Sequence, residues 1–328
     1  STLADHPWRD LGVAAGYDPA LFNNPSPESD YHKMNMDMRG DERQETVVNY
    51  QLGLSINWDL GSVLLTSITG YVDVDSLSIH DEDSAAIAVV HTLGDHGGNA
   101  FSQELRLASE YESAFQWIIG GYFQKETADS AFILDLTDLY RIAYGYPAAG
   151  SFPGADTGYG LSNIYTLDTS SWAAFLHTTY AWTDKIVTTH GLRYTNDDMD
   201  SVRFNAGYTE FPRTSTLSFI DPSIHEDYGG GATRTTADSW GELTWRFAVE
   251  YAARDDLLLY ASISSGYKSG KINLFGMLNL NVDPETVISY ETGIKSRFFD
   301  NRLTLNAAVF YYDYRDYQYY ENLPDPTT

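Results

Sequence analysis

The chain has 328 residues, and its 46 Asp and Glu outweigh its 20 Lys and Arg to give a formal net charge of −26. So acidic a chain repels phosphate backbones, which argues against nucleic acid as a partner. The absence of cysteine excludes disulfides, thiolate catalysis and Cys–zinc sites together. No apolar run reaches the roughly 18 residues of a helical membrane span, whereas a membrane barrel remains open because its signal per strand is weak.

The first 45 residues are rich in Pro, Asn and Asp and show no sustained period, so we expect a long loop rather than a folded domain. From Val48 onward, apolar and polar residues alternate with period two, as in a strand with one apolar face. The alternation resumes after the turn Asp59–Gly61 and continues to about Asp75. The sequence therefore predicts a first β-hairpin here.

Four more hairpins follow in the same style, which makes ten predicted strands. Their turns are Glu110–Ala114, Thr183–Lys185, Ala252–Asp256 and Phe298–Arg302. The segments between hairpins are long and polar, and we expect loops at residues 76–100, 127–170 and 196–238. Short turns at one end and long loops at the other are typical of outer-membrane barrels, whereas a soluble sandwich has no reason to keep this regularity.

The hairpin at residues 101–126 shows most clearly which face each residue occupies. Apolar Phe101 and Leu105 alternate with charged Glu104 and Arg106. In a barrel the apolar face meets lipid and the polar face lines the lumen. The residues expected on the lumen wall by this alternation are Glu104, Arg106, Glu242, Arg246, Glu250, Glu291 and Lys295.

Several phrases of the sequence resemble the barrel of TonB-dependent receptors, which are active transporters of Gram-negative outer membranes. The matching phrases are LTSITGY (65–71), SQELRLAS (102–109), FQWIIGGYFQKE (115–126), LLLYASISSGYKSGKIN (257–273), PETVISYETGIKS (284–296) and FDNRLTLNAAVFYYDYRDYQ (299–318). The resemblance implies an all-β, transmembrane antiparallel β-barrel of about 22 strands, with short periplasmic turns and long extracellular loops. This chain would supply about ten strands from the middle of that barrel.

The resemblance also implies a division of the chain. Residues 1–45 would be a long extracellular loop, and residues 46–328 would form the five hairpins of a partial barrel domain. By this resemblance, we expect the N-terminal plug and the C-terminal strands of the family to lie outside residues 1–328. Because open sheet edges are costly in lipid, we expect further segments or another chain to complete the sheet.

Two groups of tyrosines are candidates for different roles. Tyr140, Tyr144, Tyr146 and Tyr159 fall in the expected loop 127–170, where tyrosines suit ligand recognition; a membrane-interface girdle is the alternative. A second group near the C-terminal end is interpreted as a strand top and girdle. Its members are Tyr311, Tyr312, Tyr314, Tyr317, Tyr319 and Tyr320.

An acidic, His-containing stretch offers a weak metal candidate. Asp81, Asp83, His91 and His96 supply carboxylates and imidazoles, which are suitable metal ligands. Their spacing matches neither an EF-hand nor a zincin. A solvated acidic loop, or divalent cations that bridge the acids to lipopolysaccharide phosphates, are the other interpretations.

The resemblance favours active uptake of a scarce small-molecule ligand, with a ferric siderophore as the first expectation. Implied partners are a TonB-type inner-membrane energy-transducing complex acting through the plug, outer-membrane lipid and lipopolysaccharide. Enzyme motifs such as GxSxG and HExxH do not occur, and we expect neither enzymatic activity nor a cofactor. A passive porin and a surface adhesin or scaffold are the alternatives.

Overall fold

A computed structural model of the chain describes residues 9–14, 16, 45–81, 91–136, 139, 142, 157–212, 232–274, 281–300 and 302–319. Ten strands form one antiparallel sheet, in which each strand pairs with its neighbour in sequence. The strands are β1 (Glu45–Asp59), β2 (Val63–Asp81), β3 (His91–Ser109), β4 (Phe115–Asp135), β5 (Thr157–Thr183), β6 (Ile186–Pro212), β7 (Ala232–Arg254), β8 (Leu257–Lys268), β9 (Glu285–Phe298) and β10 (Leu303–Arg315). A six-residue helix, α1 (Arg9–Ala14), lies within the segment expected to be a loop.

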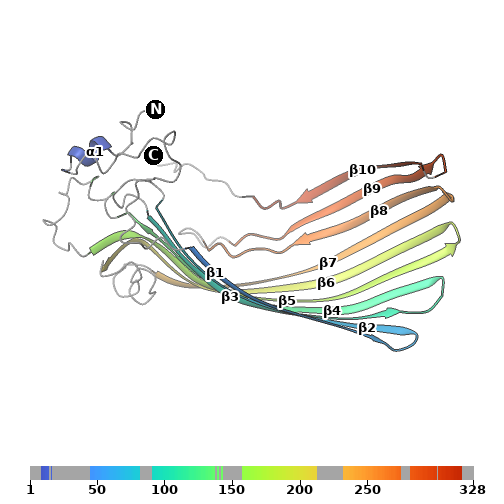
Figure 1. The fold of residues 1–328 in the computed structure, drawn as a ribbon, viewed down its shortest axis with the longest axis horizontal. Helices are drawn as coiled ribbons and strands as arrows, with labels where there is room; N and C mark the ends of the chain where they lie inside the picture. The colour runs from blue at the N-terminus through green and yellow to red at the C-terminus, as the bar shows by residue number, and fades with distance from the viewer. Residues whose placement is uncertain are drawn as a thin grey trace.

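The sheet curves into an open trough, with the short turns of its hairpins at one end (Figure 1). Within the described residues β1 and β10 each pair with one strand. Gly61 closes the first turn at a φ of 93°, a backbone conformation that favours glycine, and its amide donates to Asp59 Oδ1 at 2.7 Å. The antiparallel all-β fold and its ten strands are confirmed. No helix among the described residues is long and apolar enough to cross a membrane.

The strands extend further from the turns than the sequence predicted. Residues 127–135 and 157–170, expected in a loop, are part of β4 and β5, and residues 196–212 belong to β6. β2 likewise continues to Asp81, and β3 already begins at His91. The expectation of loops was wrong here because polar residues interrupt the apolar–polar alternation, although the backbone ladder continues. Buried Ile79, Leu93 and Ile133 lie opposite one another within these extensions.

Side-chain hydrogen bonds support these polar extensions across the strands. Thr127 Oγ1 donates to Asp168 Oδ1, and Thr166 Oγ1 donates to Asp129 Oδ1, both at 2.6 Å. Cross-strand pairs of this kind stabilise antiparallel sheets.

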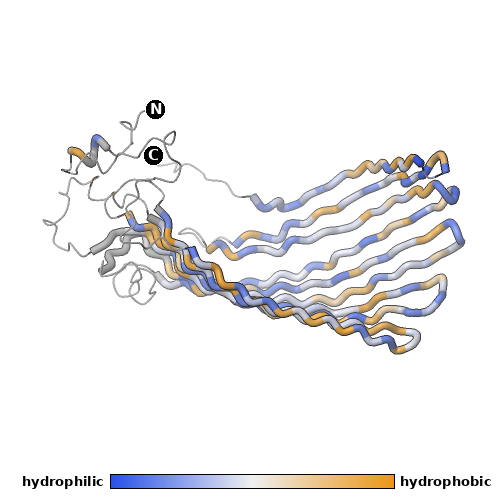
Figure 2. Tube along the Cα trace, viewed as in Figure 1, coloured by the Kyte–Doolittle hydropathy of each residue, from blue (hydrophilic) through white to orange (hydrophobic). Residues whose placement is uncertain are grey.

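Apolar positions alternate with polar ones along the strands (Figure 2). The exposed apolar side chains, among them Leu105, Ile119 and Leu192, form an apolar band on the convex face. On β5 the outward Trp172 and Trp182 lie ten positions apart and are 46% and 64% exposed. Ten residues correspond to roughly 33 Å along a strand and, at a tilt of about 40°, to the roughly 25 Å band that a transmembrane barrel presents to lipid. Phe115 and Phe123 frame the same band on β4.

The concave face is shaped by glycines that let aromatic rings lie flat across a neighbouring strand. A Cβ on Gly120 would meet the ring of Phe175, which lies on the adjacent strand. A Cβ on Gly293 would approach Tyr260 Cε1 to 2.6 Å. Both glycines therefore fix the position of a ring on the wall that the charged residues share.

Candidate functional site: the concave wall of the sheet

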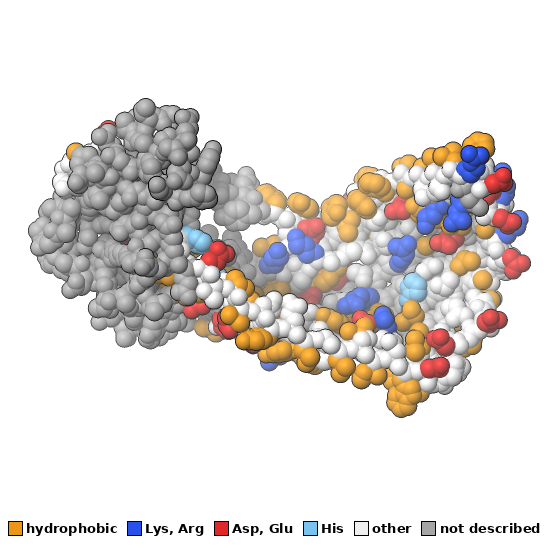
Figure 3. All heavy atoms as spheres, in the orientation of Figure 1, with side chains coloured by type: hydrophobic (Ala, Val, Ile, Leu, Met, Phe, Trp, Pro, Cys, Tyr) orange, Lys and Arg blue, Asp and Glu red, His pale blue; other side chains and the backbone are white. Residues whose placement is uncertain are grey.

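Basic and acidic side chains gather in the hollow of the sheet, whereas apolar side chains follow its outer rim (Figure 3). Side chains directly opposite each other on paired strands share a face. Arg106 lies opposite Gly120, which lies opposite Phe175, and Phe175 lies opposite Arg193. Arg193 in turn lies opposite Thr244. The concave face therefore includes Arg106 and every second residue of β7 counted from Thr244.

This register places all seven expected lumen residues on the concave wall. Glu104 and Arg106 come from β3, whereas Glu242, Arg246 and Glu250 come from β7. Glu250 lies opposite Tyr260, and Tyr260 lies opposite Gly293. Because Glu291 and Lys295 are each two residues from Gly293 on β9, they share the same face.

Two groups of close contacts occur among these lumen residues and their neighbours, one on β3 and one on β8 and β9. Arg106 Nη1 lies 3.4 Å from Glu104 Oε1. On β8 and β9, Tyr260 donates its hydroxyl to Glu291 Oε1 at 2.6 Å, and Lys295 Nζ lies 5.5 Å from the centre of the Tyr260 ring. The wall thus holds short-range ionic and hydrogen-bonded pairs with their charged groups turned into the hollow.

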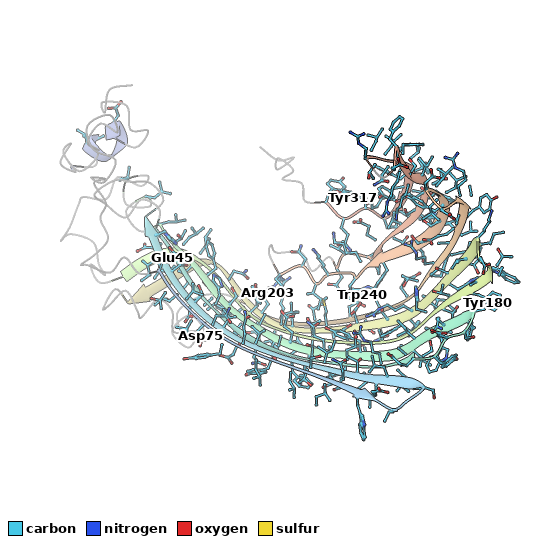
Figure 4. The ribbon with its side chains drawn as sticks, turned by 45° about the vertical axis from the view of Figure 1, so that its right-hand side comes forward. Glu45, Asp75, Tyr180, Arg203, Trp240 and Tyr317 are labelled. Carbon is cyan, nitrogen blue, oxygen red and sulfur yellow. The ribbon has the colours of Figure 1, made fainter. Side chains whose placement is uncertain are left out.

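The connection between β8 and β9 folds inward over the concave wall. Its described parts, residues 269–274 and 281–284, are named the strap here, and Lys271 pairs with Val282 inside it. Trp240 of β7 packs against Gly270, where a Cβ would meet the indole ring. Figure 4 shows Trp240 and Arg203 inside the curve of the sheet, whereas Asp75 lies outside it.

Three hydrogen bonds tie this region to β6 and β7. Arg203 Nη1 donates to the Asn273 carbonyl at 2.7 Å, and Asn281 Nδ2 donates to Asp238 Oδ2 at 2.7 Å. Tyr267 at the end of β8 donates its hydroxyl to Asp197 Oδ2 at 3.2 Å. The strap is therefore anchored to the wall beside the outer end of the apolar band.

Gln318 fastens the strap from the other side. Its side-chain amide donates to the carbonyls of Ser269 and Asp283, both at 2.9 Å, and its backbone amide donates to Glu285 Oε2 at 2.9 Å. Glu285 is buried and also lies 3.7 Å from Lys268 Nζ. The segment after β10 and the base of the strap thus form one hydrogen-bonded unit.

Arg203 is the most buried cation of this region, at 4% exposure. It lies opposite Arg234 on β7. Burial lowers the pKa of the Arg203 guanidinium, and the adjacent charge of Arg234 lowers it further by a smaller amount. Two arginines thus lie side by side above the apolar band.

Replacing Gly270 by valine is expected to push the strap off the wall. The new Cβ would come within 2.6 Å of both Trp240 Cζ2 and the Val282 carbonyl, and overpacking of this kind costs about 1–3 kcal/mol. Trypsin cleavage at Lys271, followed by mass spectrometry, should accelerate about tenfold, because cleavage follows local opening. Gly53→Val, with open space around the new side chain, is the control. Equal cleavage rates in both variants would contradict a docked strap.

The expected ligand tyrosines lie mostly beyond what the structure describes. Tyr140, Tyr144 and Tyr146 are outside the described residues. Tyr159 lies on β5, its backbone opposite Glu210, and its side chain is not described. Their role in ligand recognition stays a prediction.

The expected metal ligands are only partly described. The backbones of Asp81 and His91 lie opposite each other at the ends of β2 and β3, and Asp83 is outside the described residues. His96 lies on the concave face of β3, where its Nδ1 is 2.8 Å from Ser130 Oγ. In the described part of the chain no group of three His, Asp or Glu side chains is arranged to hold a metal ion. Metal binding by the four residues together stays a prediction.

The C-terminal tyrosines divide between the two faces of β10. Tyr311 is outward and lies opposite Tyr290, with ring centres 6.3 Å apart, as a girdle requires. Tyr312 and Tyr314 alternate with it and share the concave face with Phe310, whose ring stacks on Tyr312 at 5.1 Å. The girdle interpretation was wrong for Tyr312 and Tyr314, because consecutive strand residues point to opposite faces. Tyr320 lies outside the described residues.

Three residues important to the wall escaped the sequence reasoning. Arg193 lies in a recognised strand and could have been found by the same alternation as Arg106. Trp240 and Arg203 matter through contacts with the strap, which are distant in sequence and leave no local signal.

An antiparallel sheet with an apolar, aromatic-edged outer face and a charged inner face is the wall of a transmembrane β-barrel. Residues 2–328 match the family described as "TonB dependent receptor-like, beta-barrel". The chain belongs to this family, and its place is therefore the outer membrane of a Gram-negative bacterium. The family consists of transporters and receptors.

Solved structures of similar fold include three outer-membrane receptors. The ferric yersiniabactin uptake receptor FyuA from Yersinia pestis matches with a TM-score of 0.63 and 17% identity over 83% of this chain and 36% of that one. The siderophore receptor PiuA from Acinetobacter baumannii matches with a TM-score of 0.56 and 15% identity, over 82% of this chain and 40% of that one. The ferric-catecholate import receptor Fiu from E. coli K12 matches with a TM-score of 0.54 and 15% identity, over 86% of this chain and 42% of that one. At these identities the likeness shows the fold, and this chain spans less than half of each receptor.

Proposed function

We propose that the complete protein takes up a scarce small-molecule ligand across the outer membrane by a TonB-dependent mechanism. The observation that carries this proposal is the match to the family along residues 2–328. The concave wall supports it: the Glu104–Arg106 ion pair and the Tyr260–Glu291 hydrogen bond can exchange partners with a lumenal segment or a passing solute at low cost.

A ferric siderophore is the ligand class we propose. The receptors of similar fold include those named for ferric yersiniabactin, a siderophore and ferric catecholates. Aromatic side chains on the concave face of β10, among them Tyr312 and Tyr314, suit a ligand with planar rings.

Transport in this scheme needs no bond chemistry. An energy-transducing partner of the TonB type would pull on a plug inside the barrel and open a path along the concave wall. In this scheme the concave wall holds the plug and the ligand by hydrogen bonds and ion pairs that break at a small cost in free energy.

The test measures accumulation of radioactive iron from a panel of ferric siderophores. Three strains are compared: the parent, a deletion of this gene and a deletion of the gene for the energy transducer. We expect one siderophore whose uptake falls to the same background in both deletions. Uptake that depends on this gene and persists without the transducer would instead establish a passive pore. Equal uptake in all three strains for every siderophore would reject the ligand class.

A further inference from the structure

Arg193 on β6 is held by aromatic rings rather than by a carboxylate. Its guanidinium carbon lies 5.8 Å from the ring centre of Tyr122 and 5.9 Å from that of Phe175, both on the concave face. At such distances the ring faces attract the cation. Arg193 Nε donates to Thr195 Oγ1 at 3.0 Å, which fixes the plane of the guanidinium.

The terminal nitrogens of Arg193 have no acceptor among the residues that the structure describes. Four other cations of the described sheet pair with carboxylates. These pairs are Arg106 with Glu104, Arg254 with Asp256, Lys268 with Glu285 and Arg315 with Asp313. In a chain of net charge −26, an arginine oriented by rings and left without a carboxylate stands out.

Two further basic residues flank Arg193 on the same face. Gly191, two positions along β6, lies opposite His177 on one side and Arg246 on the other. Because Gly191 has no side chain, His177 Nδ1 comes within 3.8 Å and Arg246 Cβ within 3.6 Å of the point where a Cβ would stand. The side chain of Arg246 also makes no hydrogen bond or ion pair with any described residue. Gly191 thus leaves open space between the side chains of His177 and Arg246.

We infer that Arg193 and Arg246, with His177 as a further donor, form a carboxylate-binding site about halfway down the lumen. The planar guanidinium fork matches a carboxylate in two-point geometry, and orientation by the rings lowers the entropy lost on binding. The depth follows from Leu192, the outward neighbour of Arg193, which is 51% exposed within the apolar band.

The inference rests on the proposed function only in treating the concave wall as the lining of a passage. A carboxylate can reach the site from two sources: a side chain of a polypeptide segment inside the lumen, or an anionic solute that passes through. Both would use the same donors, so the experiment must separate them.

The test compares the thermal unfolding midpoint of the purified complete protein in detergent micelles, with citrate or with chloride at equal ionic strength. The variants are Arg193→Gln and Arg246→Gln, and Arg254→Gln, which removes a paired arginine at a turn, is the matched control. Arg246→Gln is decisive because it removes no side-chain hydrogen bond or ion pair within the described part of the chain, so a purely structural change would leave its midpoint at that of the control.

If the carboxylate comes from a solute, citrate raises the midpoint of the parent protein, and the apparent affinity for citrate falls about tenfold in Arg246→Gln, as expected for the loss of one charge-assisted hydrogen bond. If it comes from a lumenal segment, Arg246→Gln already unfolds about 2 °C or more below the control in chloride, and citrate has no effect. No citrate effect together with equal midpoints for Arg246→Gln and the control would overturn the inference. None of these readouts depends on transport, so the site can fail while uptake stands, and the reverse.

Discussion

A polypeptide restricted to residues 1–328 is expected to stay sensitive to protease when refolded with lipid vesicles, whereas the complete protein becomes resistant. The reason lies in β1 and β10, which each pair with one strand in the described sheet. Over the roughly nine residues that cross the lipid, each free edge exposes about five backbone N–H and C=O groups of each kind. Every unsatisfied group costs several kcal/mol in lipid, so the total reaches tens of kcal/mol.

The measurement is the fraction of chain that survives proteinase K in vesicles, read on gels with and without heating. Adding a separately expressed polypeptide that carries the remaining strands should restore resistance if further strands complete the sheet. Resistance of residues 1–328 alone would show that these ten strands close or pair by themselves, and the proposal of a larger barrel would then fail.

Ile119→Arg is expected to destabilise the protein strongly, whereas Ile118→Arg is expected to be nearly neutral. The two isoleucines are neighbours on β4 and differ in the face they occupy: Ile119 lies opposite Leu107 and Leu176, whereas Ile118 lies opposite His177 on the concave wall. Ile119 is 49% exposed and stands midway between Phe115 and Phe123, hence near the bilayer midplane. An arginine on the lipid face at that depth costs about 2–4 kcal/mol.

The quantity to measure is the free energy of unfolding of the complete protein from lipid vesicles in guanidinium chloride. Ile118→Arg adds the same side chain one residue away, where water replaces lipid, and should change this free energy by about 0.5 kcal/mol. Similar losses for both variants would mean that the convex face does not meet lipid and that the assignment of faces is wrong.

The sequence by itself determined the order of the hairpins, the turns and the two faces of the sheet. Strand alternation is a local property, and it is strong wherever one face meets lipid and the other water. For this reason Phe101 and Leu105 could be separated from Glu104 and Arg106, and the same alternation gave the seven charged residues of the concave wall. The matching phrases gave the family.

Only the tertiary structure decided how far the strands extend and what covers the wall. Beyond the apolar band polar residues interrupt the alternation of β4, β5 and β6, although side chains such as Ile133 and Phe204 are buried there, so backbone pairing with a neighbour decides where a strand continues. The strap depends on Trp240, Arg203 and Gln318, which are far from it in the sequence or lie on other strands. The carboxylate site likewise needs three strands in register, because Arg193, His177 and Arg246 meet only when β5, β6 and β7 pair.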